Sequence, residues 1–351
     1  MTIIHISGSL GGGGAEQMVL QLANKSKDKI PTKVFALADL NDLETTYAKN
    51  NINYQFLHVN SFKNKSLITG LKLLRENIKN DQNVIFHCHQ FHSVLLGIIY
   101  NLRYRANPIV FTLHSSVIES FTRKLLLYLT KPFRKSDIIF SHNAKNWFLK
   151  NSIVIPNGVN FKKLHIPKQR TFNKNEVFEF LYVGRLSPEK NPLALIDFAL
   201  ELNKNRNLKF RISVLGSGIL LDNLQDLITK HHLEQIVNLK GFNSDIMPYF
   251  KNAHCLLLPS HWEGMPVVLI EAAATKLPII STPVGSIPDF LNDSNATICN
   301  LPQFSTNMLN VMNNYEISCQ KAHLLYSELK EHFDIENVYK QHLKLYNSLI
   351  N

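Results

Sequence analysis

Two glutamates, Glu263 and Glu271, lie in a segment that is predicted to begin as a loop and continue as a helix. Gly264 permits an unusual backbone angle and Pro266 suits the first position of a helix. Glu263 therefore precedes the helix, and Glu271 lies five residues into it, roughly 7 Å further along at ~1.5 Å per residue. A carboxylate among Val, Leu, Ile and Ala is costly to bury unless donors hydrogen-bond it, and the vicinal hydroxyls of a ribose are such donors.

Glu263 has a different environment, because it lies at the positive end of the predicted helix. There it can accept hydrogen bonds from the hydroxyls of a sugar. A structural interpretation stays open for both acids. In that interpretation Glu263 caps the helix, and Glu271 pairs with a backbone amide or a basic residue.

Two cations five residues apart, Arg185 and Lys190, follow a predicted strand that ends at Val183. Gly184 opens this loop, and prolines stiffen its turn. Arg offers a planar fork to a diphosphate, and Lys adds a point charge beside it. A departing nucleoside diphosphate gains negative charge in the transition state, so cations here would aid catalysis as well as binding. The alternative is an ordinary solvated loop.

Two glycine-containing loops also follow predicted strands. The first, residues 8–14, ends in four consecutive glycines that include Gly13 and Gly14, and the second contains Gly216. Glycine lets the backbone approach a ligand closely, and the first loop leads into a helix N-terminus, which favours anions. The pattern is not G-x-G-x-x-G and no P-loop Lys follows, so it gives little support to a nicotinamide or P-loop site. A flexible loop is the alternative.

Apolar strands and helical segments alternate along the whole chain, which predicts parallel sheets that are buried on both faces. A break rich in Gly, Pro, Lys and Asn at residues 157–174 separates two such series. We therefore expect an α/β fold of two Rossmann-like, doubly wound domains that face a cleft, with ligands beyond the carboxyl ends of the strands. The expected strands are Ile3–Ser7, Lys33–Leu37, Tyr54–Val59, Val84–His87, Ile109–Leu113, Ile138–Ser141 and Ile153–Pro156, then Phe178–Val183, Arg211–Leu215, Val237–Leu239, Cys255–Pro259, Ile279–Ser281 and Ala296–Cys299.

The positive charge is confined to the first half of the chain. Residues 1–165 carry 21 Lys and Arg against 9 Asp and Glu, whereas the whole 351-residue chain has a net charge of +11. The stretch Arg123–Lys135 mixes cations with large apolar residues, so it is either a surface for an anionic membrane or an ordinary solvated basic helix. No nucleic-acid motif accompanies the charge, and no apolar run is long enough to span a bilayer. The N-terminus is predicted to be a buried strand rather than a signal peptide, which indicates a cytoplasmic location, and the four cysteines are expected to be reduced and buried.

Taken together, the motifs resemble family 4 of the retaining glycosyltransferases, the group 1 enzymes of the GT-B fold. The resemblance rests on Glu263-Gly-Met-Pro…Glu271, Gly184-Arg185-Leu…Lys190-Asn-Pro, Gly13-Gly14-Ala-Glu16, Asn157-Gly-Val and Thr282-Pro-Val-Gly285. It implies a first domain of residues 1–160 that binds the acceptor and includes a returning C-terminal helix at about 334–351. It implies a second domain of residues 161–333 that binds the nucleotide sugar.

The resemblance also implies roles for individual residues. Arg185 and Lys190 would hold the diphosphate, Glu263 the transferred sugar and Glu271 the ribose. His114 is the candidate for a contact with donor sugar or acceptor, with His89 a weaker one, although chance placement is easy among fifteen histidines. Other residues are expected near the donor: Gly13, Gly14, Gly184, Gly216, Phe242, Gly264, Met265, Pro266, Val267 and Gly285.

The expected activity is metal-independent, retaining transfer of a hexosyl-type sugar from a UDP- or GDP-sugar to an acceptor hydroxyl. The leaving phosphate would take the proton of that hydroxyl. No cofactor or metal is expected, because the chain has no Asp-x-Asp and the cations can stabilise the charge. The acceptor would be a lipid-linked, lipopolysaccharide, capsule or exopolysaccharide glycan, reached from the inner face of the cytoplasmic membrane. A non-hydrolysing sugar-nucleotide epimerase and a non-catalytic binding module are the alternatives.

Overall fold

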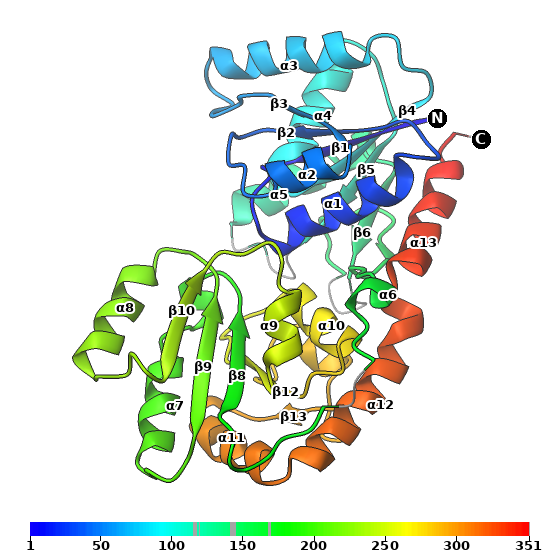
Figure 1. The fold of residues 1–351 in the computed structure, drawn as a ribbon. Helices are drawn as coiled ribbons and strands as arrows, with labels where there is room; N and C mark the ends of the chain where they lie inside the picture. The colour runs from blue at the N-terminus through cyan, green and yellow to red at the C-terminus, as the bar shows by residue number, and fades with distance from the viewer. Residues whose placement is uncertain (115–117, 119, 141–144, 168–169, 351) are drawn as a thin grey trace. The chain divides into compact units, whose positions relative to one another are not determined.

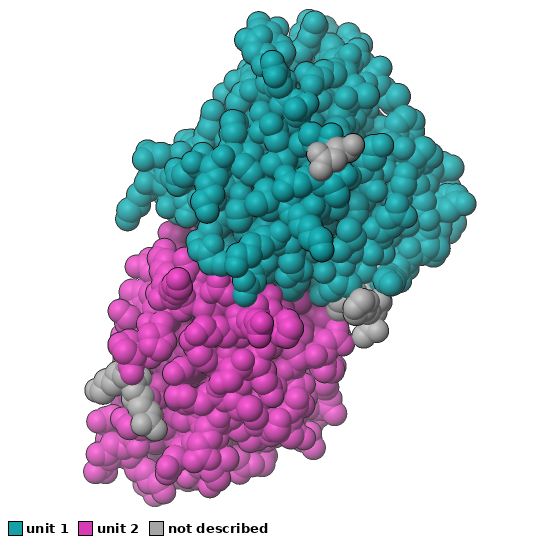
Figure 2. All heavy atoms as spheres, turned by 90° about the vertical axis from the view of Figure 1, so that its right-hand side faces the viewer, with its two compact units in different colours: residues 1–158, 335–351 teal, residues 159–334 magenta. Residues whose placement is uncertain are grey.

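The computed structural model describes residues 1–114, 118, 120–140, 145–167 and 170–350. The chain divides into two compact units, one of residues 1–158 with 335–351 and one of residues 159–334 (Figure 2). Each unit contains a parallel sheet covered by helices, as Figure 1 shows. The expected α/β fold with two doubly wound parallel sheets is therefore confirmed.

The first unit is built on a seven-stranded sheet of order β3-β2-β1-β4-β5-β6-β7. The strands β1, β4, β5 and β6 in the middle of this sheet are rich in Ile, Val and Phe and are buried on both faces, as a sheet between two helical layers requires, whereas the edge strands β3 and β7 are partly exposed. The predicted strand 138–141 lies two residues earlier in the structure, at Ser136–Ile139, and Ser141 lies outside the described residues. The strands are β1 (Thr2–Ser7), β2 (Thr32–Ala36), β3 (Asn53–Phe56), β4 (Val84–His89), β5 (Ile109–Thr112), β6 (Ser136–Ile139) and β7 (Ile153–Val154).

Alternate strand residues face opposite helical layers, since side chains along a strand point to opposite faces. Ile3 packs in a cluster with residues of α1 and of the C-terminal helix α13, whereas Ile4 packs in a cluster with residues of α3, α4 and α5. The helices of this unit are α1 (Gly14–Ser26), α2 (Glu44–Lys49), α3 (Lys65–Ile78), α4 (Phe91–Arg103), α5 (Phe121–Leu129), the 3-10 turn η1 (Lys131–Phe133) and α13 (Ile335–Asn347).

The second unit has a six-stranded sheet of order β10-β9-β8-β11-β12-β13. Its strands are β8 (Phe178–Val183), β9 (Phe210–Leu215), β10 (Val237–Gly241), β11 (Cys255–Leu258), β12 (Ile279–Ser281) and β13 (Thr297–Ile298). Its main helices are α6 (Phe161–Leu164), α7 (Ala194–Asn203), α8 (Leu221–Lys230), α9 (Met247–Asn252), α10 (Val267–Ala274), α11 (Phe304–Asn313) and α12 (Tyr315–Phe333), and its 3-10 turns are η3 (Pro188–Lys190), η4 (Ile287–Asp289) and η5 (Leu301–Gln303).

The segment between the two strand series has more structure than its composition indicates. Within the predicted break at 157–174, Val159 forms a β-bridge with Asp334, and α6 follows directly. Asn160 caps α6 by accepting a hydrogen bond from the backbone N–H of Lys163. The Gly, Pro and Asn content marks the boundary correctly, but local capping builds a short helix inside it.

Candidate active site

The order of strands in the second unit brings the two charged motifs together. β8 and β11 are neighbours, and Lys190 follows the first while Glu263 follows the second. The Lys190 Nζ donates to Glu263 Oε2 at 2.5 Å, and the Ser260 hydroxyl donates to Glu263 Oε1 at 2.7 Å. Glu263 is buried, with 1% of its surface exposed. Both oxygens of the Glu263 carboxylate therefore accept hydrogen bonds inside the protein, and its contact with the transferred sugar stays a prediction.

Arg185 differs from Lys190 although the two share a loop. Its side chain is exposed, and no ion pair joins it within the residues that the structure describes. The loop beneath is rigid, because Tyr182 is buried and its hydroxyl donates to the carbonyl of Arg185 at 3.1 Å. Asn191 ends the η3 turn in the left-handed region, with φ of 51°, and donates to the Pro259 carbonyl at 3.1 Å. Arg185 therefore offers an unpaired guanidinium from a fixed backbone.

Two glycines hold the loops in place by close backbone packing. A side chain at Gly216, with φ of +148°, would place its Cβ 1.9 Å from the Gly184 carbonyl oxygen. A side chain at Gly285, with φ of +60°, would place its Cβ 1.8 Å from the Glu263 carbonyl oxygen. Both distances are far inside van der Waals contact. Both glycines therefore make room for the neighbouring loop, and the expectation that they also lie near the donor stays a prediction.

Glu271 is the fifth residue of α10, as its spacing predicts. Within the described parts of the chain its carboxylate accepts no hydrogen bond and joins no ion pair. The side chain keeps some exposure, yet burial raises the pKa of its carboxyl to about 7. Neither partner of the structural alternative, a backbone amide or a basic residue, is present there. A desolvated carboxylate with no donors is costly, so it is a strong candidate for a ligand contact.

The start of α10 differs from the expectation by one residue. Pro266 is the N-cap rather than the first helical residue, and no side chain caps the helix. Gly264 accepts a hydrogen bond from the Ser286 hydroxyl through its carbonyl, and Met265 is buried. Val267 opens the helix. The backbone N–H of Leu269 donates to the Pro266 carbonyl at 3.1 Å, which leaves the N–H groups of Val267 and Val268 available to an anion.

Phe242 lies apart from these residues in the chain, directly after β10. Its ring is 39% exposed, and the preceding Gly241 has φ of +67°. An exposed aromatic face at the carboxyl end of a strand can stack on a planar base.

In the first unit the glycine loop lies between β1 and α1. Gly13 is the N-cap of α1 and Gly14 its first residue, and no side chain caps the helix. No role was assigned from the sequence to Glu16, although it belongs to the family motif at this loop, and Ser9 and Gln90 were not named. Glu16 is buried and accepts from Ser9 at 3.4 Å and from Gln90 at 3.2 Å.

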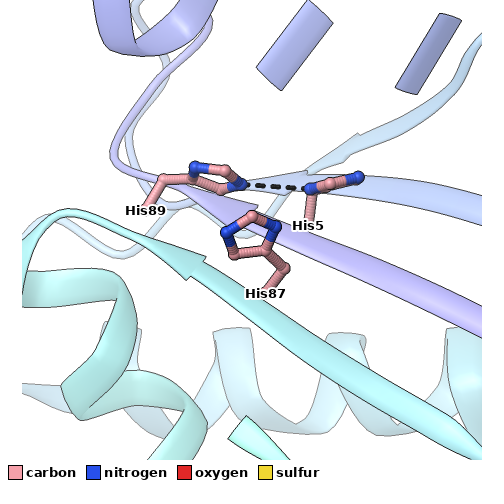
Figure 3. Close-up of side chains that lie close together, drawn as sticks. All are labelled: His5, His87 and His89. Carbon is pink, nitrogen blue, oxygen red and sulfur yellow. Dashed lines mark hydrogen bonds between the residues drawn. The ribbon is translucent and has the colours of Figure 1, made fainter. Parts of the chain in front are cut away.

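His114 follows β5 and heads a chain of histidines. Its Nε2 lies 2.9 Å from His89 Nδ1, and His89 Nε2 lies 3.0 Å from His5 Nδ1. His87, two residues from His89 on β4, lies beside them (Figure 3). Burial lowers the pKa of His114 and of His5 to about 3, with a further contribution from His342. His5 and His87 were not predicted as site residues, although their alternation with apolar residues along two strands was a usable signal.

Each of the two units matches a known protein family over most of its length. The family described as glycosyl transferases group 1 matches residues 165–314, and the one described as Glycosyltransferase Family 4 matches residues 12–163. The chain belongs to the group 1, family 4 glycosyltransferases. The chain is 30% identical over 239 residues to the UDP-Gal:α-D-GlcNAc-diphosphoundecaprenol α-1,3-galactosyltransferase of Escherichia coli, a match that covers 62% of this chain and only 61% of that protein.

A second relative is matched over a larger share of its length. The chain is 24% identical over 298 residues to the N-acetylgalactosamine-N,N′-diacetylbacillosaminyl-diphospho-undecaprenol 4-α-N-acetylgalactosaminyltransferase of Campylobacter jejuni, a match that covers 78% of each chain. Among solved structures, HepE of Anabaena in complex with UDP-glucose superimposes with a TM-score of 0.85 at 18% identity, covering 99% of this chain and 100% of that one. At this identity the match establishes the GT-B fold.

Proposed function

We propose that this glycosyltransferase moves a sugar from a nucleoside diphosphate sugar to an acceptor hydroxyl, with retention of configuration and without a metal. The observation that carries the proposal is Glu271, a desolvated carboxylate without a partner among the described residues. Ribose hydroxyls supply the two donors that it lacks. A UDP-sugar is the first donor to test, because UDP-Gal and UDP-glucose stand in the names of the E. coli relative and of the HepE complex.

The charges of the second unit suit the leaving group. Arg185 presents an exposed guanidinium, Lys190 an ammonium held by Glu263, and the start of α10 uncapped N–H groups. Negative charge that develops on the departing diphosphate is stabilised by all three, which is the work that a divalent metal does in other transferases. The acceptor oxygen forms the new bond to the anomeric carbon as the phosphate oxygen leaves, and that phosphate takes the proton.

The test of the donor site is thermal stabilisation by nucleotide sugars. At a UDP-sugar concentration ~100 times Kd, we expect the melting temperature to rise by about 5–10 °C. Glu271→Gln removes the charged acceptor and is expected to weaken binding by roughly 10–100-fold. Glu201→Gln, on the exposed face of α7, is the matched control and leaves the shift unchanged. Equal shifts in wild type and Glu271→Gln would remove Glu271 from the site.

The same measurement has a pH signature. The pKa of Glu271 is raised to about 7, so the carboxylate gains a proton as the pH falls below 7 and loses its ability to accept two hydrogen bonds. UDP-sugar binding is expected to weaken below pH 7 in the wild type, since the phosphates of a diphosphate sugar do not titrate in this range. Glu271→Gln should bind weakly at every pH, with no inflection near 7.

The acceptor is proposed to be a lipid-linked glycan, because both curated relatives carry undecaprenol diphosphate in their names. The surface of α5 supports this assignment. Phe121 is 67% and Leu129 59% exposed, beside the cations Arg123 and Lys124. In the described part of the chain no helix is long and apolar enough to cross a membrane. We therefore propose peripheral binding of this α5 face to the anionic inner surface of the cytoplasmic membrane.

Liposome co-sedimentation tests the membrane surface. The wild type is expected to sediment with vesicles that contain anionic lipid at low salt, and to be released as salt screens the cations. Phe121→Ser with Leu129→Ser should abolish sedimentation, because the apolar contribution is lost. Ile219→Ser, at a site 79% exposed in the second unit, is the control and should bind like wild type. Binding that survives the double substitution would contradict the α5 assignment.

A further inference from the structure

Three loops of the second unit meet at Glu263, and they follow the neighbouring strands β8, β11 and β12. Glu263 belongs to the middle loop, and both outer loops hold the backbone of that loop. From the β8 side, the carbonyl of Glu189 accepts from the backbone N–H of His261 at 2.9 Å. From the β12 side, Thr282 Oγ1 donates to the carbonyl of Ser260 at 2.6 Å. The backbone that carries Glu263 is therefore fixed from two directions.

The carboxylate of Glu263 is held at both oxygens by two different donors. Lys190 Nζ donates to Oε2 at 2.5 Å, and the Ser260 hydroxyl donates to Oε1 at 2.7 Å. The terminal torsion of a glutamate is soft, so a bond to one oxygen alone leaves the plane of the carboxylate free to turn. The second bond fixes that plane. Because the hydroxyl is neutral, Ser260 anchors the carboxylate without cancelling the charge that pairs with Lys190.

Exposure shows which of these three groups a ligand can reach. Ser260 is 1% exposed and the side chain of Glu263 is 2% exposed, whereas the side chain of Lys190 is 27% exposed. The ammonium is thus the accessible end of the series Ser260–Glu263–Lys190. A lysine carries its charge on a flexible stem of four carbons, so its direction is not set by its own backbone. The buried carboxylate sets the direction of the Lys190 ammonium, and Ser260 sets that of the carboxylate.

We propose that Ser260 is a positioning residue of the transfer reaction, which fixes the Glu263 carboxylate and through it directs the Lys190 ammonium at the departing diphosphate. This inference rests on the proposed function, since that function assigns Lys190 to the leaving group. A cation that is already in place needs no rearrangement when negative charge develops, so it stabilises the transition state more than the bound donor. Loss of the Ser260 hydroxyl is therefore expected to lower kcat more than it weakens nucleotide binding.

A purely structural role for the Ser260 hydroxyl is the alternative, because a buried carboxylate needs donors wherever it lies. The two roles differ in whether they depend on Lys190. A structural bond contributes to the stability of the fold with or without the ammonium, and transfer then follows the folded fraction. A positioning bond affects transfer through Lys190, so its effect disappears when Lys190 is absent. A double-mutant cycle measures this dependence directly.

The experiment combines Ser260→Ala with Lys190→Ala in the full chain. The donor is the UDP-sugar that stabilises the wild type most, and the acceptor probe is GlcNAc-diphosphoundecaprenol. Ser260→Ala is expected to lower kcat roughly tenfold, the size of one hydrogen bond to a charged group, and to raise the Kd for UDP less than about threefold. In the Lys190→Ala background the same substitution should change kcat less than about twofold. Urea unfolding of each variant gives the folded fraction.

Ser281→Ala is the matched control, because Ser281 is a fully buried serine of the adjacent strand β12 whose hydroxyl donates to the carbonyls of Leu258 and Thr282. It should keep the wild-type kcat. Ser260→Cys, a near-isosteric change to a weak donor, should repeat the loss seen in Ser260→Ala without leaving a void.

Three results would overturn the inference: a loss that persists in the Lys190→Ala background, an equal loss in Ser281→Ala, or a UDP affinity that falls as far as kcat. Full transfer activity in Ser260→Ala and Ser260→Cys would also overturn it and would leave the proposed function intact. A wild type that binds no nucleotide sugar would instead contradict the proposed function.

Discussion

Lys190→Ala is expected to reduce transfer kcat/KM by roughly 10²–10³-fold, because it removes a cation from the developing charge of the leaving diphosphate. It should also lower the free energy of unfolding by about 3 kcal/mol. Lys190 is paired at 2.5 Å with Glu263, whose side chain is only 2% exposed, and the substitution leaves that carboxylate without its counter-ion. Activity and stability are measured on the same preparation, by sugar transfer to an added acceptor and by urea unfolding.

Two further variants separate the loss of transfer activity from the loss of stability. Lys190→Ala combined with Glu263→Gln removes the uncompensated charge, so stability is expected to recover while transfer stays low. Lys204→Ala is the control, because its pair with Glu201 is exposed on both sides and contributes at most ~0.5 kcal/mol. If the double variant recovered transfer, the Lys190 ammonium would have no catalytic role. Isomerised free donor formed without an acceptor would favour the epimerase alternative.

Acid is expected to unfold the first unit before the second. His5 and His114 have pKa values lowered by burial to about 3, His342 has one of about 4, and those of His87 and His89 are also well below the ordinary value. In the unfolded chain each histidine binds a proton near pH 6.5. Because the folded pKa is the lower one, full stability holds above pH 6.5 and is lost as the pH falls toward the folded values.

The loss is large because five histidines act together. At pH 5.5 His5, His114 and His342 contribute about 1.4 kcal/mol each, so these three together lower the free energy of unfolding by about 4 kcal/mol relative to neutral pH. His87 and His89 act in the same direction. Asp137, buried on β6, has a carboxyl pKa raised to about 6. The folded unit therefore binds this proton more readily than the unfolded chain as the pH falls, which offsets part of the stability that the histidines remove. Tyr346, which contacts His87, has a pKa raised by burial, so its hydroxyl stays neutral in this range.

Hydrogen exchange of the full chain between pH 7.5 and 5 measures this effect in each unit. Protection of β1, β4 and α13 is expected to collapse near pH 5.5, while the strands β8 and β9 of the second unit stay protected. His342→Gln removes one titrating group and should reduce the pH slope of the unfolding free energy by about 1.4 kcal/mol per pH unit. A first unit that keeps its protection at pH 5 would show that the histidines take up protons without unfolding.

Much of the fold followed from local patterns. Runs of Ile, Val and Phe marked the strands, because only a sheet buried on both faces tolerates such runs, and the candidate site residues lie in the loops after those strands. The position of Glu271 in the helix α10 was predictable from the number of residues that separate it from Pro266, where the helix was expected to begin. By contrast, α6 was missed, since one Asn cap in a segment rich in Gly, Pro, Lys and Asn is a weak signal.

The sequence by itself determined which residue types follow which strand, and hence the cations, the two glutamates and the family to which they belong. Only the tertiary structure decided which of these side chains contact one another. Lys190 and Glu263 are 73 residues apart and pair because β8 lies next to β11. His5, His89 and His114 form a chain because the sheet order runs β1-β4-β5. Strand order is set by how whole helices pack across a sheet, and no local spacing of residues encodes it.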